Sequence, residues 1–265
     1  MNRAALIRRL NELAEPSYRS FQLKLQVSNG EVYGVRAPAL QRLAKHIASK
    51  QGIHLFTELI RSTSLSYEET IILFKLFGLL SLTEQERLAY LPALLLFNNS
   101  WATNDCLASE MKWIRKNRDI YYPYFNALLE KEYPYDKRLG VVTLMIFYLE
   151  PATIEEVLKN LSRVESDHYY VMMALAWAYA TAYCKEKEKT LPYLQPGILV
   201  EEIRKKAIQK CIESRLVSDE DKTRLKALRQ VHPKVCPFHY SDQSPISRNS
   251  HQSQSPRQIP VTPNL

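Results

Sequence analysis

Two side chains near the middle of the sequence have types and a spacing suited to chemistry at a charged centre. Trp101 and Asp105 stand four residues apart, just after the segment Phe97–Asn99. On a helix this spacing places both on one face, near the N-terminal end, where unpaired backbone N–H groups point outward. The helix dipole there orients a carboxylate and keeps it ionised. From spacing alone, a core tryptophan with a surface aspartate is the more common arrangement.

An arginine and a second tryptophan lie in later apolar segments. Arg138 opens the apolar run that extends to Met145. A guanidinium at the edge of such a helix can clamp a phosphate bidentately, although an arginine in this position also fits a side chain that simply reaches out to water. Trp177 lies among methionines, alanines and tyrosines, a composition that by default indicates a buried helix.

Positive charge is concentrated in two short segments that contain no acidic residue within their spans, so the field of each is not cancelled locally. Solvated helix faces have the same composition. If both segments face the inner side of a curved protein, they would follow the backbone of a nucleic-acid duplex. The residues are Lys112, Arg115, Lys116 and Arg118 in the first segment, and Arg204, Lys205, Lys206 and Lys210 in the second.

Three possible soft ligands stand close together near the C-terminus, namely His232, Cys236 and His239. A structural zinc site needs four ligands, and no fourth residue is apparent. We therefore predict no metal site. The four cysteines of the chain show no CxxC spacing, which is simplest to interpret as reduced thiols in the cytosol.

Composition excludes several classes of protein. The chain has only 6 glycines in 265 residues and none in a phosphate-binding cluster, which excludes Rossmann and P-loop folds and disfavours sheet-rich ones. The net charge of +8 favours an anionic partner without distinguishing nucleic acid from an acidic protein or a membrane surface. No export signal is visible, and the longest apolar stretches fall short of the roughly 18 residues that cross a bilayer. We expect a cytoplasmic protein.

Helix start signals recur along the chain and predict an all-α fold. Capping boxes begin at Ser66, Thr83 and Thr153, and Ser218 begins an aspartate variant. Pro38 suits the first turn of a helix that would end at Gly52. About a dozen helices of 10 to 17 residues with short links predict antiparallel pairs stacked as a HEAT-like solenoid. An ordinary globular helical domain is the alternative.

The helical pattern stops near Arg229. Residues 241–265 contain six serines, four prolines and no aromatic residue, a composition that buries too little surface to offset the entropy lost on ordering. We therefore predict one helical-repeat domain over residues 1–230 and a disordered tail over residues 231–265.

Four segments, taken together, resemble the DNA alkylation repair family of HEAT-like-repeat glycosylases, the AlkD-like proteins. No single segment is diagnostic, but their order and spacing agree with the family from about Tyr18 to Arg229. They are Gly34–Leu40, Ser100–Asp105, Arg138 with the apolar run to Tyr148, and Tyr169–Thr181 followed by Lys206–Lys210.

The resemblance implies excision of N3- or N7-alkylated purines from duplex DNA, by a monomer without metal or cofactor. It implies that Trp101 and Asp105 lie against the sugar of the lesion, that Arg138 contacts the nearby backbone, and that Trp177 faces DNA. The chain departs from the family's active branch after Trp177. In that branch an Arg-Glu pair closely follows the tryptophan, whereas here the segment Ala178–Ala182 follows it. A non-catalytic binder of damaged or branched DNA therefore remains an alternative, with a protein-binding scaffold third.

Overall fold

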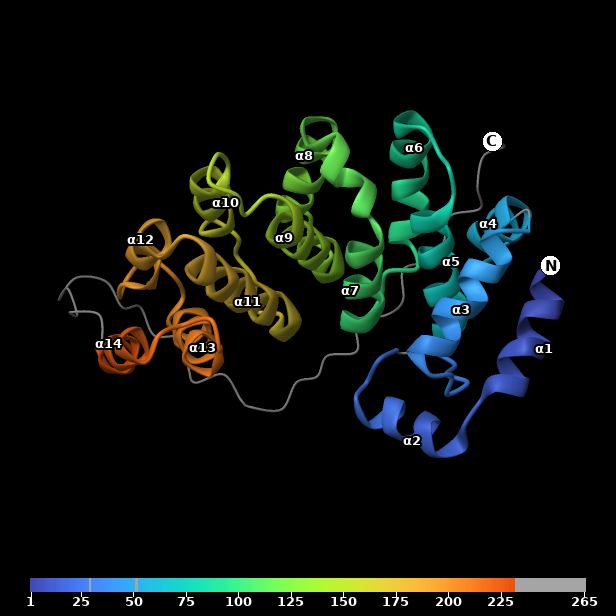
Figure 1. Ribbon diagram of the computed structural model, residues 1–265, viewed down its shortest axis with the longest axis horizontal. Coiled ribbons are helices and arrows are strands. Elements are labelled where there is room, and N and C mark those ends of the chain that lie inside the picture. Colours follow the sequence, from blue (N-terminus) through green and yellow to red (C-terminus); the bar gives the residue numbers. More distant parts are fainter. Residues whose placement is uncertain (29, 51, 232–265) are drawn as a thin grey trace.

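The computed structural model describes residues 1–28, 30–50 and 52–231 of the chain. Within these ranges the chain forms fourteen α-helices and three short 3-10 helices, and no strand (Figure 1). The all-α prediction is confirmed. The predicted tail beyond Val231, with its possible ligands His232, Cys236 and His239, lies outside the described residues.

Six helices form a first layer in which each packs on the next along the chain. Their first residues are 30 to 35 positions apart, which is the structural repeat of the protein. No strict period was visible in the sequence because loops and helix lengths vary around this spacing. The helices are α3 (Ala37–Ala48), α5 (Tyr67–Leu79), α7 (Trp101–Glu110), α9 (Pro134–Phe147), α11 (Tyr169–Lys185) and α13 (Glu201–Glu213).

The intervening helices form a second layer on the other side of the first (Figure 1). They are α4 (Gly52–Ile60), α6 (Glu84–Leu95), α8 (Arg118–Ala127), α10 (Ile154–Leu161) and α12 (Lys187–Thr190), with 3-10 turns η1 (Lys112–Lys116), η2 (Leu128–Glu130) and η3 (Leu191–Leu194) between them. Helices α1 (Arg3–Leu13) and α2 (Pro16–Lys24) lie at one end and α14 (Asp219–Gln230) at the other. The two layers bend into an arc, so the predicted solenoid is confirmed.

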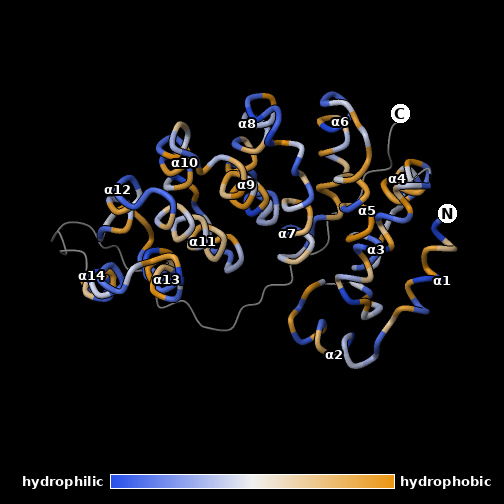
Figure 2. The backbone as a smooth tube through the Cα atoms, viewed as in Figure 1, coloured by the Kyte–Doolittle hydropathy of each residue, from blue (hydrophilic) through white to orange (hydrophobic). Residues whose placement is uncertain are grey.

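One hydrophobic core lies between the layers and extends from Leu6 in α1 to Leu225 in α14. Apolar residues are concentrated in helices such as α5, whereas α14 is largely hydrophilic (Figure 2). The difference follows from position, because an inner helix packs on neighbours on both sides and the last helix on one. No helix in the described ranges combines the length and the apolar composition that crossing a membrane requires.

Three of the four predicted helix starts have the expected cap. The side chains of Ser66, Thr83 and Ser218 each accept a hydrogen bond from the backbone N–H three residues later. The predicted cap at Thr153 is wrong: Thr153 precedes α10, but its backbone (φ −121°, ψ −13°) is not in the extended conformation of the other three cap residues, and its side chain makes no cap hydrogen bond. The interpretation of Gly52 as a helix end is also wrong, since Gly52 begins α4.

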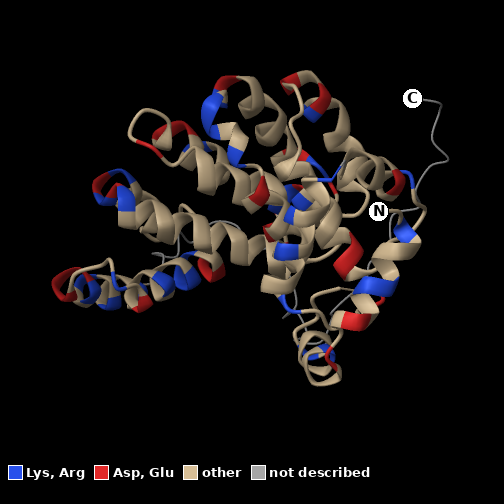
Figure 3. Cartoon of the chain, turned by 45° about the vertical axis from the view of Figure 1, so that its right-hand side comes forward, with Lys and Arg blue, Asp and Glu red and all other residues tan. Residues whose placement is uncertain are grey.

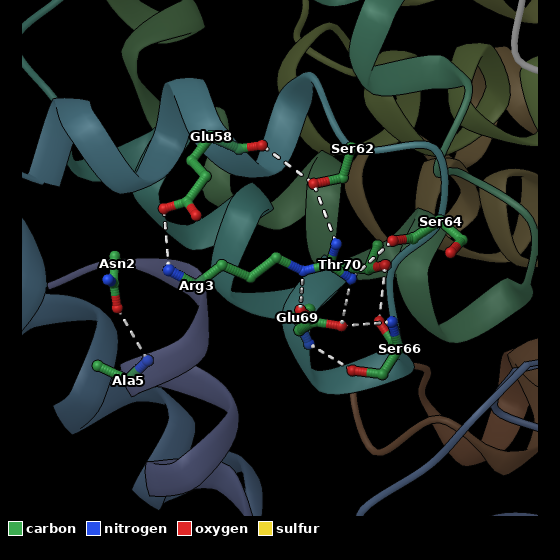
Figure 4. Close-up of polar contacts among 9 residues, drawn as sticks. All are labelled: Asn2, Arg3, Ala5, Glu58, Ser62, Ser64, Ser66, Glu69 and Thr70. Carbon is green, nitrogen blue, oxygen red and sulfur yellow. Dashed lines mark hydrogen bonds and ion pairs between the residues drawn. The ribbon is translucent and has the colours of Figure 1, made fainter.

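The first helix is held by an arginine that reaches the start of α5 (Figure 4). Arg3 Nε donates to Glu69 Oε1 at 2.6 Å, and its Nη2 donates to the carbonyl of Ser64 at 2.8 Å. The second oxygen of Glu69 accepts from the backbone N–H of Ser66 at 2.8 Å. A single carboxylate therefore closes the capping box of α5 and anchors α1 to it.

The neighbouring carboxylate fixes the loop that enters α3. Glu68 is fully buried and accepts hydrogen bonds from the backbone N–H groups of Tyr33, Gly34 and Val35 at 2.9, 2.8 and 3.1 Å. Gly34 has φ +94°, and a Cβ there would lie 2.6 Å from Cβ of Arg19. Only glycine therefore permits both the left-handed backbone and the close approach of α2.

We expect Glu68→Gln to destabilise the fold by about 2 kcal/mol, because its amide nitrogen would face a backbone donor and leave buried groups unpaired. Urea unfolding measures the loss. Glu220→Gln is the control, since Glu220 makes an exposed pair with Arg224 and such pairs contribute about 0 to 1 kcal/mol. Equal stability of the two variants would contradict this account of the loop.

Candidate functional site

Helix α7 carries Trp101 and Asp105 on one side, as the spacing predicts. Its start is fixed by a reciprocal cap, in which Ser100 Oγ accepts from the N–H of Thr103 at 3.1 Å and Thr103 Oγ1 accepts from the N–H of Ser100 at 3.1 Å. Ser100 Oγ also lies 2.6 Å from the carbonyl oxygen of Val27, to which it donates. The beginning of α7 is thus joined to the segment that follows α2.

Trp101 is half-buried and held by the same segment. Its indole Nε1 donates to the carbonyl oxygen of Leu25 at 3.2 Å. The hydrogen bond satisfies the single polar group of the ring and restrains its orientation. Trp101 is therefore neither a fully buried core residue nor a freely rotating surface side chain.

Asp105 forms a bidentate ion pair with Arg138 of the neighbouring helix α9. Arg138 Nε and Nη2 donate to Asp105 Oδ1 at 3.1 and 2.9 Å, and Nη2 also donates to Oδ2 at 2.8 Å. The third nitrogen, Nη1, donates to the carbonyl oxygen of Tyr170 in α11 at 2.6 Å. One guanidinium therefore links three consecutive helices of the first layer.

The two partners of this pair differ in exposure. The side chain of Arg138 is 6% exposed, whereas that of Asp105 is 27% exposed. Desolvation raises the pKa of the Asp105 carboxyl above its ordinary value, while the charge and hydrogen bonds of Arg138 oppose that rise. Asp105 thus presents a partly exposed carboxylate whose ionisation depends on a buried cation behind it.

The buried position of Arg138 requires a correction to the phosphate-clamp interpretation. Each nitrogen of its guanidinium already donates to Asp105 or to the Tyr170 carbonyl. Because the side chain is also 6% exposed, a bidentate phosphate contact would require the guanidinium to give up Asp105. Its geometry instead suits a residue that orients the Asp105 carboxylate and favours its ionised form. The sequence could not reveal this because the two partners are 33 residues apart.

Trp177 lies on α11 with its side chain 39% exposed, which does not fit the default interpretation of a core residue. It lines a shallow pocket of about 350 Å³ between α11 and α13 together with Lys210 and Leu216. An exposed indole beside a lysine offers a stacking surface next to a positive charge.

The first basic segment forms η1 and the first residue of α8, and lies at the end of α7 opposite Trp101. Lys112, Arg115 and Lys116 are exposed there. Arg118 differs from them because its guanidinium is paired with Glu150, so part of its charge is neutralised within the protein.

The second basic segment lies on α13 and divides into buried and exposed residues. Lys and Arg residues share this end of the described chain with Asp and Glu residues (Figure 3). Arg204 is fully buried and binds Glu201 at 2.7 Å and the carbonyl oxygen of Val231 at 2.8 Å. The prediction that Arg204 contacts DNA is therefore wrong, because its guanidinium joins α13 to the end of α14. Lys205 pairs with Glu201 at 3.3 Å, and Lys206 is exposed.

The comparison with protein families identifies one family for the greater part of the chain. The family model described as DNA alkylation repair enzyme matches residues 6–211, a range that contains every residue of the Trp101, Asp105, Arg138 and Trp177 surface. No curated protein and no solved structure matches the chain significantly. Because the matched range covers more than half of the sequence, the chain belongs to the DNA alkylation repair enzyme family.

Proposed function

We propose that the protein is a DNA glycosylase that excises N3- or N7-alkylated purines from duplex DNA by hydrolysing the N-glycosidic bond. The observation that carries the proposal is the partly exposed Asp105 carboxylate, which is fixed and charged by Arg138 behind it and lies in the same helix as Trp101. A fixed negative charge at a surface suits a reaction in which positive charge develops on a sugar.

The chemistry needs little from the protein because the substrate is already activated. Alkylation at N7 or N3 makes the base cationic, so the bond from the sugar C1′ to the base can break with its electrons going to the base. The base leaves neutral, and the sugar passes through an oxocarbenium-like state. Water then bonds to C1′ and loses a proton, which leaves an abasic site and a free purine.

We assign separate roles to the residues of the site. Asp105 stabilises the oxocarbenium-like sugar or orients the attacking water, and the face of Trp101 favours the developing cation. Arg138 acts through Asp105. Trp177 and nearby Lys210 contact the DNA, as do the exposed Lys112, Lys116 and Lys206. These residues contact the phosphate backbone of the DNA and therefore bind without selecting a base sequence. No metal or organic cofactor takes part in this proposal.

A specific observation favours one alternative, a non-catalytic binder of damaged or branched DNA. Ala178 and Tyr179, which follow Trp177, are both fully buried. The whole segment Ala178–Ala182 contains no charged residue, so it lacks the backbone contact that an Arg-Glu pair would provide in the family's active branch. The two functions are separated by whether free base is released from alkylated DNA, since both predict binding to the duplex.

Binding should weaken as salt rises, because lysine and arginine contacts release counterions condensed on the phosphates. We expect Lys210→Gln to lower the affinity and to reduce the slope of log K against log salt by about 1. Lys159→Gln is the matched control, since Lys159 lies on α10 and lines a separate pocket with Tyr193. Equal slopes for Lys210→Gln and the unaltered protein would remove Lys210 from the interface.

A further inference from the structure

Two buried asparagines converge on a single backbone oxygen beside the candidate site. Asn98 Nδ2 donates to the carbonyl oxygen of Tyr135 at 3.0 Å, and Asn104 Nδ2 donates to the same oxygen at 2.7 Å. Both asparagines are fully buried. The sequence offered no signal for them, because uncharged amides in a helix or its preceding loop are common.

Their location connects them to the proposed catalytic pair. Asn104 directly precedes Asp105 on α7, and Tyr135 stands three residues before Arg138 on α9. The amide contact therefore lies about one helical turn from the ion pair. Asn98 precedes the cap residue Ser100, so the second amide holds the beginning of α7 against the same point on α9.

In each of the two amides the nitrogen makes a hydrogen bond within the described residues and the oxygen does not, which indicates a role in positioning rather than in stability. The Oδ1 atoms of Asn98 and Asn104 are buried and accept no hydrogen bond from the described residues. An unpaired buried acceptor lowers stability, so apolar residues of similar size would hold the core at least as well. The two amides specify position instead, since sliding α7 along α9 breaks both contacts at once.

We propose that Asn98 and Asn104 are positioning residues that set the register of α7 against α9 and so hold Asp105 at its working distance from the sugar. The inference rests on the proposed glycosylase function. Neither asparagine needs to touch DNA. A displacement of about 1 Å at a reacting group can lower a rate by about 100-fold, so weak contacts in the right place have large effects on rate.

The test compares chemistry with stability in Asn104→Leu, with Asn98→Leu as a second variant. We expect the single-turnover rate of base release to fall by about 10- to 100-fold, with DNA affinity unchanged and the melting temperature unchanged or higher. Asn160→Leu is the matched control. Asn160 donates to Asn126 Oδ1 at 2.9 Å and to the Tyr122 hydroxyl at 3.1 Å, between α10 and α8 of the second layer, and its loss should leave the rate unaltered.

A double-mutant cycle shows whether Asn104 acts through Asp105. In an Asp105→Asn background, Asn104→Leu should cost no further rate, because the group that it positions is already gone. Independent losses that multiply would overturn the inference, and so would a wild-type rate in both leucine variants.

A second measurement does not depend on base release. The Nε–H of Arg138 should exchange slowly with solvent in NMR spectra of the unaltered protein, and faster in Asn104→Leu because the ion pair loosens. Asn160→Leu should leave that signal unchanged. If the unaltered protein releases no base, the proposed function fails, yet the exchange rate still decides the role of Asn104. If the Arg138 Nε–H exchanges as slowly in Asn104→Leu as in the unaltered protein, the positioning role of Asn104 is refuted.

Discussion

Asp105→Asn is expected to lower the single-turnover release of 7-methylguanine by about 100-fold or more, the scale on which a lost electrostatic stabiliser of developing charge is felt. The affinity for DNA should hold or rise. The substitution removes a negative charge that repels phosphates and keeps the shape of the side chain. Saturating enzyme isolates the chemical step from binding, and filter binding or anisotropy gives the affinity.

The variant also loses part of an ion pair, so its folding must be measured beside its activity. Breaking a fully buried pair costs about 3 to 5 kcal/mol, and the 27% exposure of Asp105 makes the cost smaller here. Thermal melting of the variant supplies that control, and Asp105→Glu provides a second variant that keeps the charge. Wild-type release by a folded Asp105→Asn protein would exclude a catalytic role for the carboxylate.

Arg138→Gln is expected to change the pH dependence of excision and to have little effect on DNA affinity. Desolvation already raises the pKa of Asp105, and Arg138 opposes it. Removing the cation therefore raises this pKa further. The ionised carboxylate is the active form in the proposed mechanism, so the acid limb of the rate profile should move to higher pH. At neutral pH the rate should fall about tenfold or more.

The rate of base release and the DNA affinity, each measured against pH, separate this account from the phosphate clamp. A clamp predicts a loss of affinity with an unchanged acid limb, because the guanidinium would then act on DNA rather than on Asp105. Arg224→Gln is the control, since Arg224 forms an exposed pair with Glu220 on α14. It should leave both the affinity and the acid limb as they are.

Local features of the fold could be predicted from the sequence because helix signals act within a few residues. The caps at Ser66, Thr83 and Ser218 needed only the hydroxyl and its neighbours. The cap predicted at Thr153 failed because its backbone is not extended there, a conformation that the hydroxyl and its neighbours in the sequence do not determine. The four-residue spacing of Trp101 and Asp105 was enough to predict that they share one face of a helix.

Features that join distant helices could not be predicted in the same way. The guanidinium of Arg138 in α9 binds Asp105 in the neighbouring helix α7. The buried guanidinium of Arg204 donates to the carbonyl oxygen of Leu228 in α14, which lies more than twenty residues later. In the sequence, both arginines stood in segments that predict contact with a phosphate. Their contacts depend on which faces of the repeats pack together, and a single sequence with variable loop lengths does not specify that.

The most direct test of the central claim is release of free 7-methylguanine from alkylated duplex DNA by the unaltered protein, followed under single-turnover conditions with a chelator present. Free base and an abasic site are expected to accumulate in equal amounts, at a rate that depends on Asp105. Tight binding to the same duplex with no base released would contradict the claim and would identify a non-catalytic DNA binder.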